Sequence, residues 1–307
     1  MLLVKNIAKS FKTITAVEDV SFHVERGMFY GLLGPNGAGK TTTINMISAI
    51  LPPDKGSMFA DGKNIYENTA DVKRMMGIVP QEIALYDDLS AYANLLFWGS
   101  LYGIKGNDAK RRADQLLEWV GLSDRKKHLI KTYSGGMKRR INIANALMHD
   151  PALIIMDEPT VGIDPQSRNN IYALLQDLHT QGKTILYTTH YIEEAEKMCD
   201  KIGIIDKGKI IAEGTLQELK TKNDMEESIV ISFDEKSYKP AALPGYTIHY
   251  AEGKNEMTIF SKNINHDLSE VIKKCAEAGV IINNIDIRHI NLETVFLNLT
   301  GRQLRDE

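Results

Sequence analysis

One stretch of the chain reads Gly34-Pro35-Asn36-Gly37-Ala38-Gly39-Lys40-Thr41, which fits the pattern G-x-x-x-x-G-K-[ST] of a phosphate-binding loop. Its three glycines allow a tight turn in which successive main-chain N–H groups point at one anion. The Lys40 ammonium adds a compact positive charge for phosphates, and the Thr41 hydroxyl can ligate Mg²⁺. A chance match by a Gly-rich turn is expected in about one chain of this length in a hundred.

The segments on either side of this loop have the patterns of a strand and a helix. Residues 27–33 form a short apolar run of the kind found in buried strands. Residues 42–51 are expected to be helical, and Pro52-Pro53 would end that helix. Because the helix should begin near Lys40, the positive end of its dipole adds to the anion site. This strand–loop–helix context predicts an α/β fold.

Length and composition limit the classes of protein that the chain can belong to. Its 307 residues allow about two domains, and its net charge of −3 gives no sign of a nucleic-acid partner. No apolar run approaches the roughly 18 residues of a membrane span, and the first residues lack the layout of a signal peptide. Cys199 and Cys275 lie far apart outside any C-x-x-C pair, which indicates small buried side chains in a reducing cytoplasm.

Around the phosphate loop, the sequence predicts an antiparallel β edge and a helical insert. Residues 1–33 have β-type composition interrupted by turn residues. A short strand ends at Gln81, and the region from about 85 to 145 is mostly helical in pattern. Phe11 is expected in a turn of the β edge, where it could stack on a nucleotide base or belong to the core. Both interpretations of Phe11 remain open at this point.

A second helix start has the features of an anion site. It reads Tyr133-Ser134-Gly135-Gly136-Met137, with Ser134 as a good N-cap. Bare N–H groups, a hydroxyl and a positive dipole can bind an anion there, although an ordinary capped helix would look the same. The basic run at residues 138–140 is interpreted as a solvated helix face.

Two further strands end in residues that can take part in chemistry. The buried strand at 152–156 leads into Asp157 and Glu158. Adjacent residues of a strand point in different directions, so one carboxylate can face a metal and the other a reacting water. The strand at 183–189 ends at His190. A histidine in that position is usually structural, but ligands of α/β folds gather at such strand ends.

The residue pattern changes at residues 215–227, where a short segment of helical pattern is followed by a polar stretch. We place a domain boundary there, with a first domain at 1–220 and a second at 225–307. Strand and helix patterns in the second part predict a small α+β domain. It contains no Gly-rich loop, no clustered carboxylates and no metal-ligand spacing, so we expect an accessory or dimerisation role.

Taken together, these motifs resemble the ATPase subunit of an ABC transporter over residues 1 to about 220. Phe11 matches the family's adenine-stacking aromatic, Gly34–Thr41 its Walker A loop and Gln81 its Q-loop. Tyr133–Met137 matches the signature and Leu153–Glu158 the Walker B strand. Val161–Asp164 matches the D-loop and His190 the H-loop. The signature departs from the usual Leu-Ser-Gly-Gly-Gln at Tyr133 and Met137, and Val161 replaces the usual Ser of the D-loop.

The resemblance implies a P-loop NTPase (RecA-like) cassette with an antiparallel β edge and a helical insert, plus the small C-terminal α+β domain. Tyr-Ser-Gly-Gly-Met, Val-Gly-Ile-Asp-Pro-Gln and the chain's end at 292–297 are similar to the drug-resistance and multidrug exporter branch.

The resemblance also implies roles for the matched residues. ATP would be bound by Phe11, Gly34, Pro35, Asn36, Gly37, Ala38, Gly39, Lys40, Thr41 and Thr42. Mg²⁺ would be held by Thr41, Gln81 and, through water, Asp157. Glu158 would polarise the attacking water, and His190 would hold the water and the γ-phosphate in line. Ser134, Gly135 and Gly136 of one subunit would cap ATP bound by another, with Asp164 in the D-loop, so that ATP closes a homodimer.

Because the sequence shows no membrane span, the resemblance implies separate transmembrane permease subunits and a peripheral place on the cytoplasmic face of the membrane. Leu85, Tyr86 and residues 92–98 of the insert are candidates for docking to a permease, or for the core of the insert. Two alternatives are a soluble ABC ATPase without a transport role and a cassette that binds ATP as a switch. One cassette without a heptad run argues against the first, and intact Glu158 and His190 argue against the second. The cargo cannot be predicted.

Overall fold

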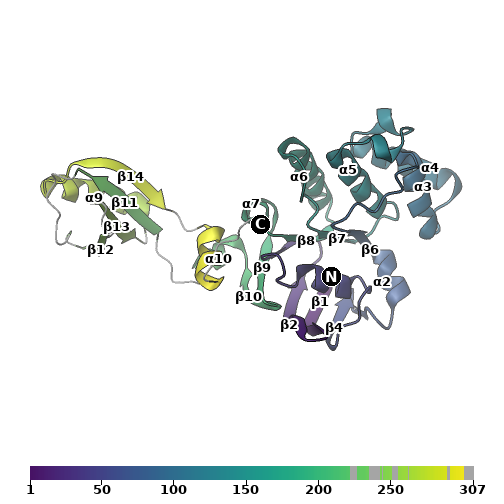
Figure 1. The fold of residues 1–307 in the computed structure, drawn as a ribbon, viewed down its shortest axis with the longest axis horizontal. Helices are drawn as coiled ribbons and strands as arrows, with labels where there is room; N and C mark the ends of the chain where they lie inside the picture. The colour runs from purple at the N-terminus through teal and green to yellow at the C-terminus, as the bar shows by residue number, and fades with distance from the viewer. Residues whose placement is uncertain are drawn as a thin grey trace. The chain divides into compact units, whose positions relative to one another are not determined.

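The computed structural model describes residues 1–221, 227–234, 243, 245–250, 255–261, 263–288 and 291–300. The chain forms two compact units (Figure 1). One comprises Met1–Leu216 and a short stretch at the end of the chain, and the other comprises Gln217–Asn298. Most of the polar stretch in which we place the domain boundary lies outside the described residues, so the boundaries 1–220 and 225–307 stay predictions.

The first unit is built on a ten-stranded sheet of order β5-β4-β1-β2-β10-β9-β3-β8-β7-β6. Its strands are β1 (Leu2–Phe11), β2 (Ile14–Val24), β3 (Phe29–Leu33), β4 (Lys55–Ala60), β5 (Lys63–Asn64), β6 (Met76–Val79), β7 (Leu153–Asp157), β8 (Thr184–Thr189), β9 (Lys201–Asp206) and β10 (Lys209–Gly214). β1 pairs antiparallel with β2 and β4, which confirms the predicted β edge. β3, β8, β7 and β6 pair in parallel, so the ends of these strands that carry the motifs share one edge of the sheet.

The helices of the first unit pack on both faces of this sheet. They are α1 (Lys40–Ile47), α2 (Thr69–Met75), α3 (Ala91–Leu101), α4 (Gly106–Trp119), α5 (Gly135–Ala146), α6 (Pro165–Thr180) and α7 (Ile192–Met198). Figure 1 shows α3, α4 and α5 grouped together, apart from the antiparallel strands β1, β2 and β4. The helical region predicted after Gln81 is therefore present.

Strand alternation divides the core into two layers. Phe29 faces one cluster with residues of α3 to α6, whereas the next residue, Tyr30, faces a second cluster with residues of α1 and the β edge. Ile154 and Ile155 of β7 divide in the same way. All residues of β3, β7 and β8 are buried, as expected for parallel strands covered on both faces. The sheet edge that carries the motifs is therefore held rigidly from both sides.

Some element boundaries differ from the sequence predictions. The helix after the phosphate loop ends at Ile47, well before the prolines, because Ala49 adopts a left-handed conformation with φ of 52°. The sequence pattern predicts a tight connection over residues 161–165, whereas α6 already begins at Pro165, since Asp164 caps it and Pro165 occupies its first turn. Phe11 is the last residue of β1 rather than part of a turn.

The second unit has a four-stranded antiparallel sheet of order β12-β13-β11-β14. Its elements are α8 (Leu216–Thr221), which begins at the boundary between the units, β11 (Glu227–Phe233), β12 (Ile248–Tyr250), β13 (Glu256–Ser261), α9 (Ile264–Glu277), β14 (Ile282–Arg288) and α10 (Leu292–Thr300). It has a core of its own, in which Val271 and Cys275 of α9 meet Ile229 and Ile259 of the sheet.

Candidate active site

The phosphate loop connects β3 to α1, and two of its glycines, Gly34 and Gly39, are required by the close approach of neighbouring backbone. Gly39 has φ of 105°, and a Cβ at this position would lie 2.5 Å from the carbonyl oxygen of Ala16. A Cβ on Gly34 would lie 2.3 Å from the carbonyl oxygen of Ile205. Gly39 caps α1 without a side-chain hydrogen bond, so the first amides of the helix remain available to an anion.

Lys40, Glu158 and His190 meet at the edge of the sheet where β3, β7 and β8 end. Lys40 Nζ lies 2.8 Å from Glu158 Oε1, and His190 Nδ1 lies 3.0 Å from Glu158 Oε2. Lys40 Nζ also donates to the carbonyl oxygens of Gly34 at 2.7 Å and Pro35 at 3.0 Å. Lys40 and Glu158 are buried. Three residues singled out from separate motifs thus form one cluster.

The electrostatics of this cluster keep the Glu158 carboxylate ionised. Burial alone would raise the pKa of Glu158, but hydrogen bonds from His190 and Lys40 and their charges outweigh burial and lower it. Glu158 also has φ of 43°, in the left-handed region that costs a non-glycine residue free energy. Its N–H is held by Thr188 Oγ1 at 3.0 Å. A strained, ionised carboxylate is therefore fixed beside the phosphate loop.

Asp157 points to a different environment from Glu158, as strand geometry predicts for adjacent residues. Its Oδ1 accepts a hydrogen bond from Thr188 Oγ1 at 2.6 Å, and the side chain is buried. Among the residues that the structure describes, Asp157 has no ion-pair partner. Thr188, which the sequence interpretation missed, contacts both carboxylate residues, and its place at the end of β8 next to Thr189 and His190 was the available signal.

Other predicted site residues lie outside this cluster. Ser134 caps α5 by accepting from the N–H of Met137 at 3.3 Å, and Asp164 Oδ1 caps α6 by accepting from the N–H of Ser167 at 2.9 Å. Within the described part of the chain, neither residue is hydrogen-bonded to Lys40 or Glu158. Phe11 is 46% exposed, so its interpretation as a core residue is wrong.

The backbone of Gln81 is hydrogen-bonded to Arg139 of α5, the helix that begins at the signature motif. The sequence interpretation assigned residues 138–140 to a solvated helix face. Arg139 of α5 is buried, which contradicts that assignment. Its guanidinium donates to the carbonyl oxygens of Pro80, at 2.7 Å, and Gln81. Burial lowers the pKa of Arg139 to about 10. α5 therefore holds the backbone at the end of β6, next to the Gln81 side chain.

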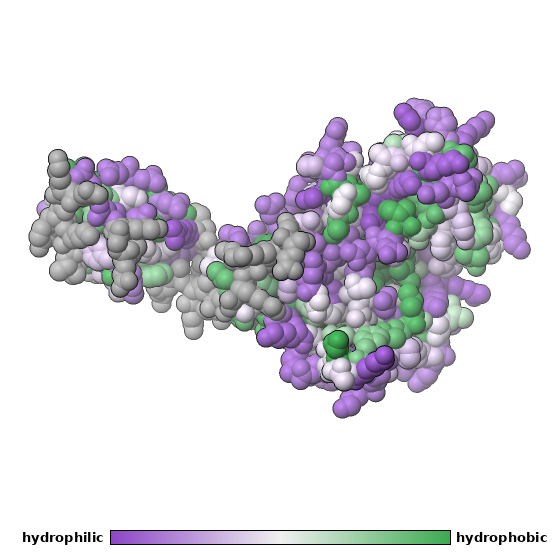
Figure 2. All heavy atoms as spheres, viewed as in Figure 1, coloured by the Kyte–Doolittle hydropathy of each residue, from purple (hydrophilic) through white to green (hydrophobic). Residues whose placement is uncertain are grey.

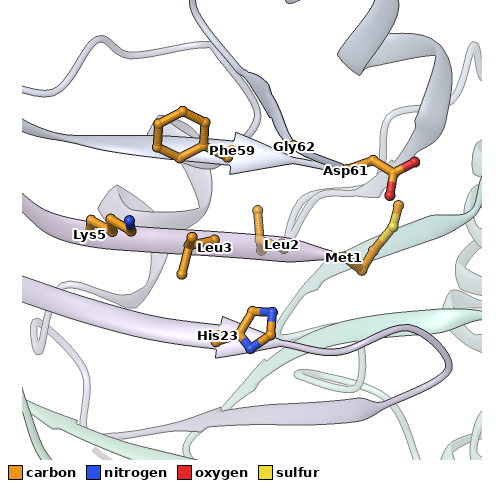
Figure 3. Close-up of a pocket in the computed structure, with 8 residues that line it drawn as sticks. All are labelled: Met1, Leu2, Leu3, Lys5, His23, Phe59, Asp61 and Gly62. Atoms are coloured by element: carbon orange, nitrogen blue, oxygen red, sulfur yellow. The ribbon is translucent and has the colours of Figure 1, made fainter.

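A surface pocket on the β edge is separate from this cluster. It has a volume of about 340 Å³ and is lined by Met1, Leu2, Leu3, Lys5, His23, Phe59, Asp61 and Gly62 (Figure 3). These residues come from β1 and the residue before it, β2, β4 and the turn that follows β4. None of them belongs to the phosphate loop or to the Lys40–Glu158–His190 cluster, so we do not include this pocket in the active site.

The fold and the cluster define the class of protein: a P-loop NTPase. Residues 17–161 match the family described as ABC transporter. The chain is 46% identical to the linearmycin resistance ATP-binding protein LnrL of Bacillus subtilis, with all of both chains covered. It is 33% identical to the daunorubicin resistance ATP-binding protein DrrA3 of Streptomyces coeruleorubidus, over 99% of this chain and 97% of that one. It is 38% identical to a Nod factor export ATP-binding protein I of Cupriavidus pinatubonensis, over 100% and 92%.

Solved structures agree with this class. An ATP-binding subunit of an ABC transporter superposes with a TM-score of 0.66 at 31% identity, covering 72% of this chain and 92% of that one. A dimeric post-hydrolysis state of the cassette MJ0796, bound to ADP and Pi, gives 0.65 at 28% identity, covering 70% and 99%. The chain belongs to the ABC transporter family, as an ATP-hydrolysing subunit of the exporter branch. No helix in the described part of the chain has both the length and the apolarity to cross a membrane.

Proposed function

We propose that this chain hydrolyses ATP as a homodimer on the cytoplasmic face of a membrane and thereby drives separate permease subunits that export a compound from the cell. The observation that carries the proposal is the Lys40–Glu158–His190 cluster in a chain that aligns with a resistance ATP-binding protein over the full length of both. The relatives' names refer to resistance to linearmycin and daunorubicin and to export of Nod factors, so we place the cargo among compounds of these kinds.

The residues fit Mg²⁺ and ATP. Asp157 is a buried carboxylate without a cationic partner in the described structure, and burying such a charge is costly unless a cation compensates it. We assign Mg²⁺ to Thr41, Gln81 and, through water, Asp157, because Mg²⁺ prefers oxygen ligands and retains water. When bound, Mg²⁺ neutralises charge on the phosphates. Phe11, exposed at the end of β1, is assigned to the adenine.

Lys40 has to change partners to bind a phosphate. Its ammonium has three donors, and all three are used by the carbonyl oxygens of Gly34 and Pro35 and by Glu158. When the Lys40 N–H that contacts Glu158 turns to a phosphate, the Glu158 carboxylate keeps His190 as its neighbour. Glu158 then acts as the general base that takes a proton from water, and His190 keeps water and base aligned.

The insert offers a surface for the permease. Leu85, Tyr92 and Leu96 pack against the core, whereas Tyr86 and Phe97 are exposed and contact each other edge to face, with ring centroids 4.9 Å apart. Figure 2 shows hydrophobic residues lying among hydrophilic ones on one face of the first unit. We propose Tyr86 and Phe97 as the docking residues, since they follow Gln81 closely in the chain.

The dimer is tested by mixing two inactive proteins. Ser134 and Gly135 are exposed at the start of α5, as a segment that acts on a second subunit requires. Ser134→Arg and Lys40→Ala proteins should each lack ATPase activity, and their mixture should regain part of it through one intact composite site. Export is tested by expressing the chain with its permease and comparing tolerance to linearmycin and daunorubicin with that of the Lys40→Ala variant. Equal tolerance would contradict export of such compounds.

A further inference from the structure

A third buried carboxylate, in addition to those of Asp157 and Glu158, belongs to Glu194 on α7. Glu194 accepts four hydrogen bonds, and all four donors are hydroxyl groups. They are Thr160 Oγ1 at 2.6 Å and Tyr172 OH at 2.7 Å, both to Oε1, and Tyr187 OH at 2.7 Å and Thr189 Oγ1 at 2.6 Å, both to Oε2. The side chain is buried. The sequence interpretation gave Glu194 no role.

These hydroxyls fully satisfy the carboxylate. An ionised carboxylate has about four acceptor sites, and two hydroxyls occupy each oxygen of Glu194. In the described structure no ion pair reaches Glu194. Short hydrogen bonds to a charged acceptor are roughly twice as strong as neutral ones. Removing the charge should therefore loosen four groups at once, since they share one acceptor.

The donors come from the segments that carry the proposed catalytic residues. Thr160 lies two residues after Glu158, and Thr189 directly precedes His190. Thr189 Oγ1 also accepts from the N–H of Tyr191 at 2.9 Å, which closes the turn that contains His190. Glu194 thus ties the turn after β7 to the turn after β8.

The strained backbone of Glu158 needs support from the residues around it, and the hydrogen bonds of Glu194 contribute to that support. A residue held at φ of 43° keeps that conformation only when the surrounding structure determines it. Thr188 holds the N–H of Glu158 from one side, and Glu194 holds Thr160 from the other. Tyr172 extends the network to α6, the helix that begins after Asp164.

We propose that Glu194 is a positioning residue for ATP hydrolysis: its carboxylate fixes the turns that carry Glu158 and His190, so that base and histidine stay aligned. The inference rests on the roles proposed for those two residues. It assigns Glu194 an effect on the chemical step, with ATP binding left to the phosphate loop.

The test compares two neighbouring glutamates in the full-length protein. Glu194→Gln keeps the shape of the side chain and removes its charge. Glu193→Gln makes the same change at an exposed position of the same helix. Misplacement of a catalytic group by about 1 Å costs about a hundredfold in rate, so kcat of Glu194→Gln should fall about 10- to 100-fold. KM for ATP should stay within about twofold, and Glu193→Gln should behave as wild type. An unchanged kcat, or a rise in KM that accounts for the loss, would overturn the proposal.

A double-mutant cycle separates positioning from a general loss of structure. If Glu194 acts through His190, Glu194→Gln should lower kcat little further in a His190→Ala background, whereas independent effects would multiply. Multiplying losses would refute the proposal. Wild-type turnover by Glu158→Gln would refute the role of Glu158, and the cycle with His190 would still decide the role of Glu194. If Glu194→Gln does not fold, Tyr172→Phe, which removes one donor, should lower kcat several-fold at constant KM, and an unchanged kcat would contradict us.

Discussion

Lys40 and Glu158 form a buried ion pair, with 2.8 Å between Nζ and Oε1. The two residues belong to different motifs, at the start of α1 and directly after β7. Their pairing means that the phosphate-binding ammonium and the proposed base neutralise each other. It also makes the stability of the site depend on both residues.

Removing Lys40 alone should destabilise the nucleotide-free protein. Lys40→Met leaves the Glu158 carboxylate buried with His190 beside it, and breaking a buried pair from one side costs about 3–5 kcal/mol. Thermal unfolding should therefore begin at a lower temperature, and the added change Glu158→Gln should restore part of the loss. Lys9→Met is the control, because its partner Asp54 is 45% exposed and such pairs contribute about 1 kcal/mol or less. Equal unfolding temperatures of the Lys40→Met and Lys9→Met proteins would argue against a stabilising ion pair between Lys40 and Glu158.

The lowered pKa of Glu158 sets the direction of a pH effect. A carboxyl group whose pKa is lower in the folded state stabilises the fold above the unfolded-state pKa, which is near 4.5, and loses that contribution as pH falls through its folded-state pKa. The free energy of urea unfolding of the wild-type protein should exceed that of the Glu158→Gln protein by a constant amount near neutral pH. This difference should shrink below pH 4.5. A difference that is unchanged at lower pH would mean that the pKa of Glu158 is not lowered.

Arg139 should control the metal dependence of the reaction through Gln81. The Arg139→Lys variant keeps the positive charge, but its ammonium cannot span the carbonyl oxygens of Pro80 and Gln81 as the planar guanidinium does. Loss of one hydrogen bond from a charged group should raise the Mg²⁺ concentration for half-maximal ATPase activity about tenfold. Arg140→Lys is the matched control, since Arg140 donates to the Val120 carbonyl in the insert, away from Gln81. If both variants show the same Mg²⁺ dependence, Arg139 has no specific part in placing Gln81.

Residues from about 225 onward should stabilise the dimer and take no part in chemistry. The second unit has its own hydrophobic core, and every residue of the catalytic cluster lies at or before His190. In a Glu158→Gln background, truncation after Asn223 should leave a cassette that binds ATP but dimerises more weakly. Sedimentation of the full-length and truncated proteins with ATP measures this difference. Equal dimer affinities would assign the domain to another partner.

Much of the site follows from local patterns in the sequence. The loop that contains Lys40 is a contiguous motif, and Asp157, Glu158 and His190 each follow an apolar run that predicts a buried strand. Since these strands are parallel, their ends meet at one edge, and the sequence alone predicts that the residues gather there.

The remaining features depend on tertiary contacts. Arg139 lies within three consecutive basic residues, and nothing local distinguishes the buried one. Glu194 stands in a charged run on α7, and its four donors come from three other segments of the chain: the turn after β7, helix α6 and strand β8. α2 was missed, because its seven residues include only one that is buried. The start of α6 was misplaced although Asp164-Pro165 is a typical start signal.

Phosphate release by the Glu158→Gln protein tests the central claim most directly. Loss of a general base costs about 10²–10⁴ in rate, so kcat should fall by that factor. ATP affinity should be retained, because Lys40 and the loop amides remain and Lys40 no longer has to leave a carboxylate. Glu193→Gln, at an exposed position, controls for the loss of one negative charge. A hundredfold or greater loss of kcat with ATP binding intact is the result we predict, and turnover at the wild-type rate would contradict the account.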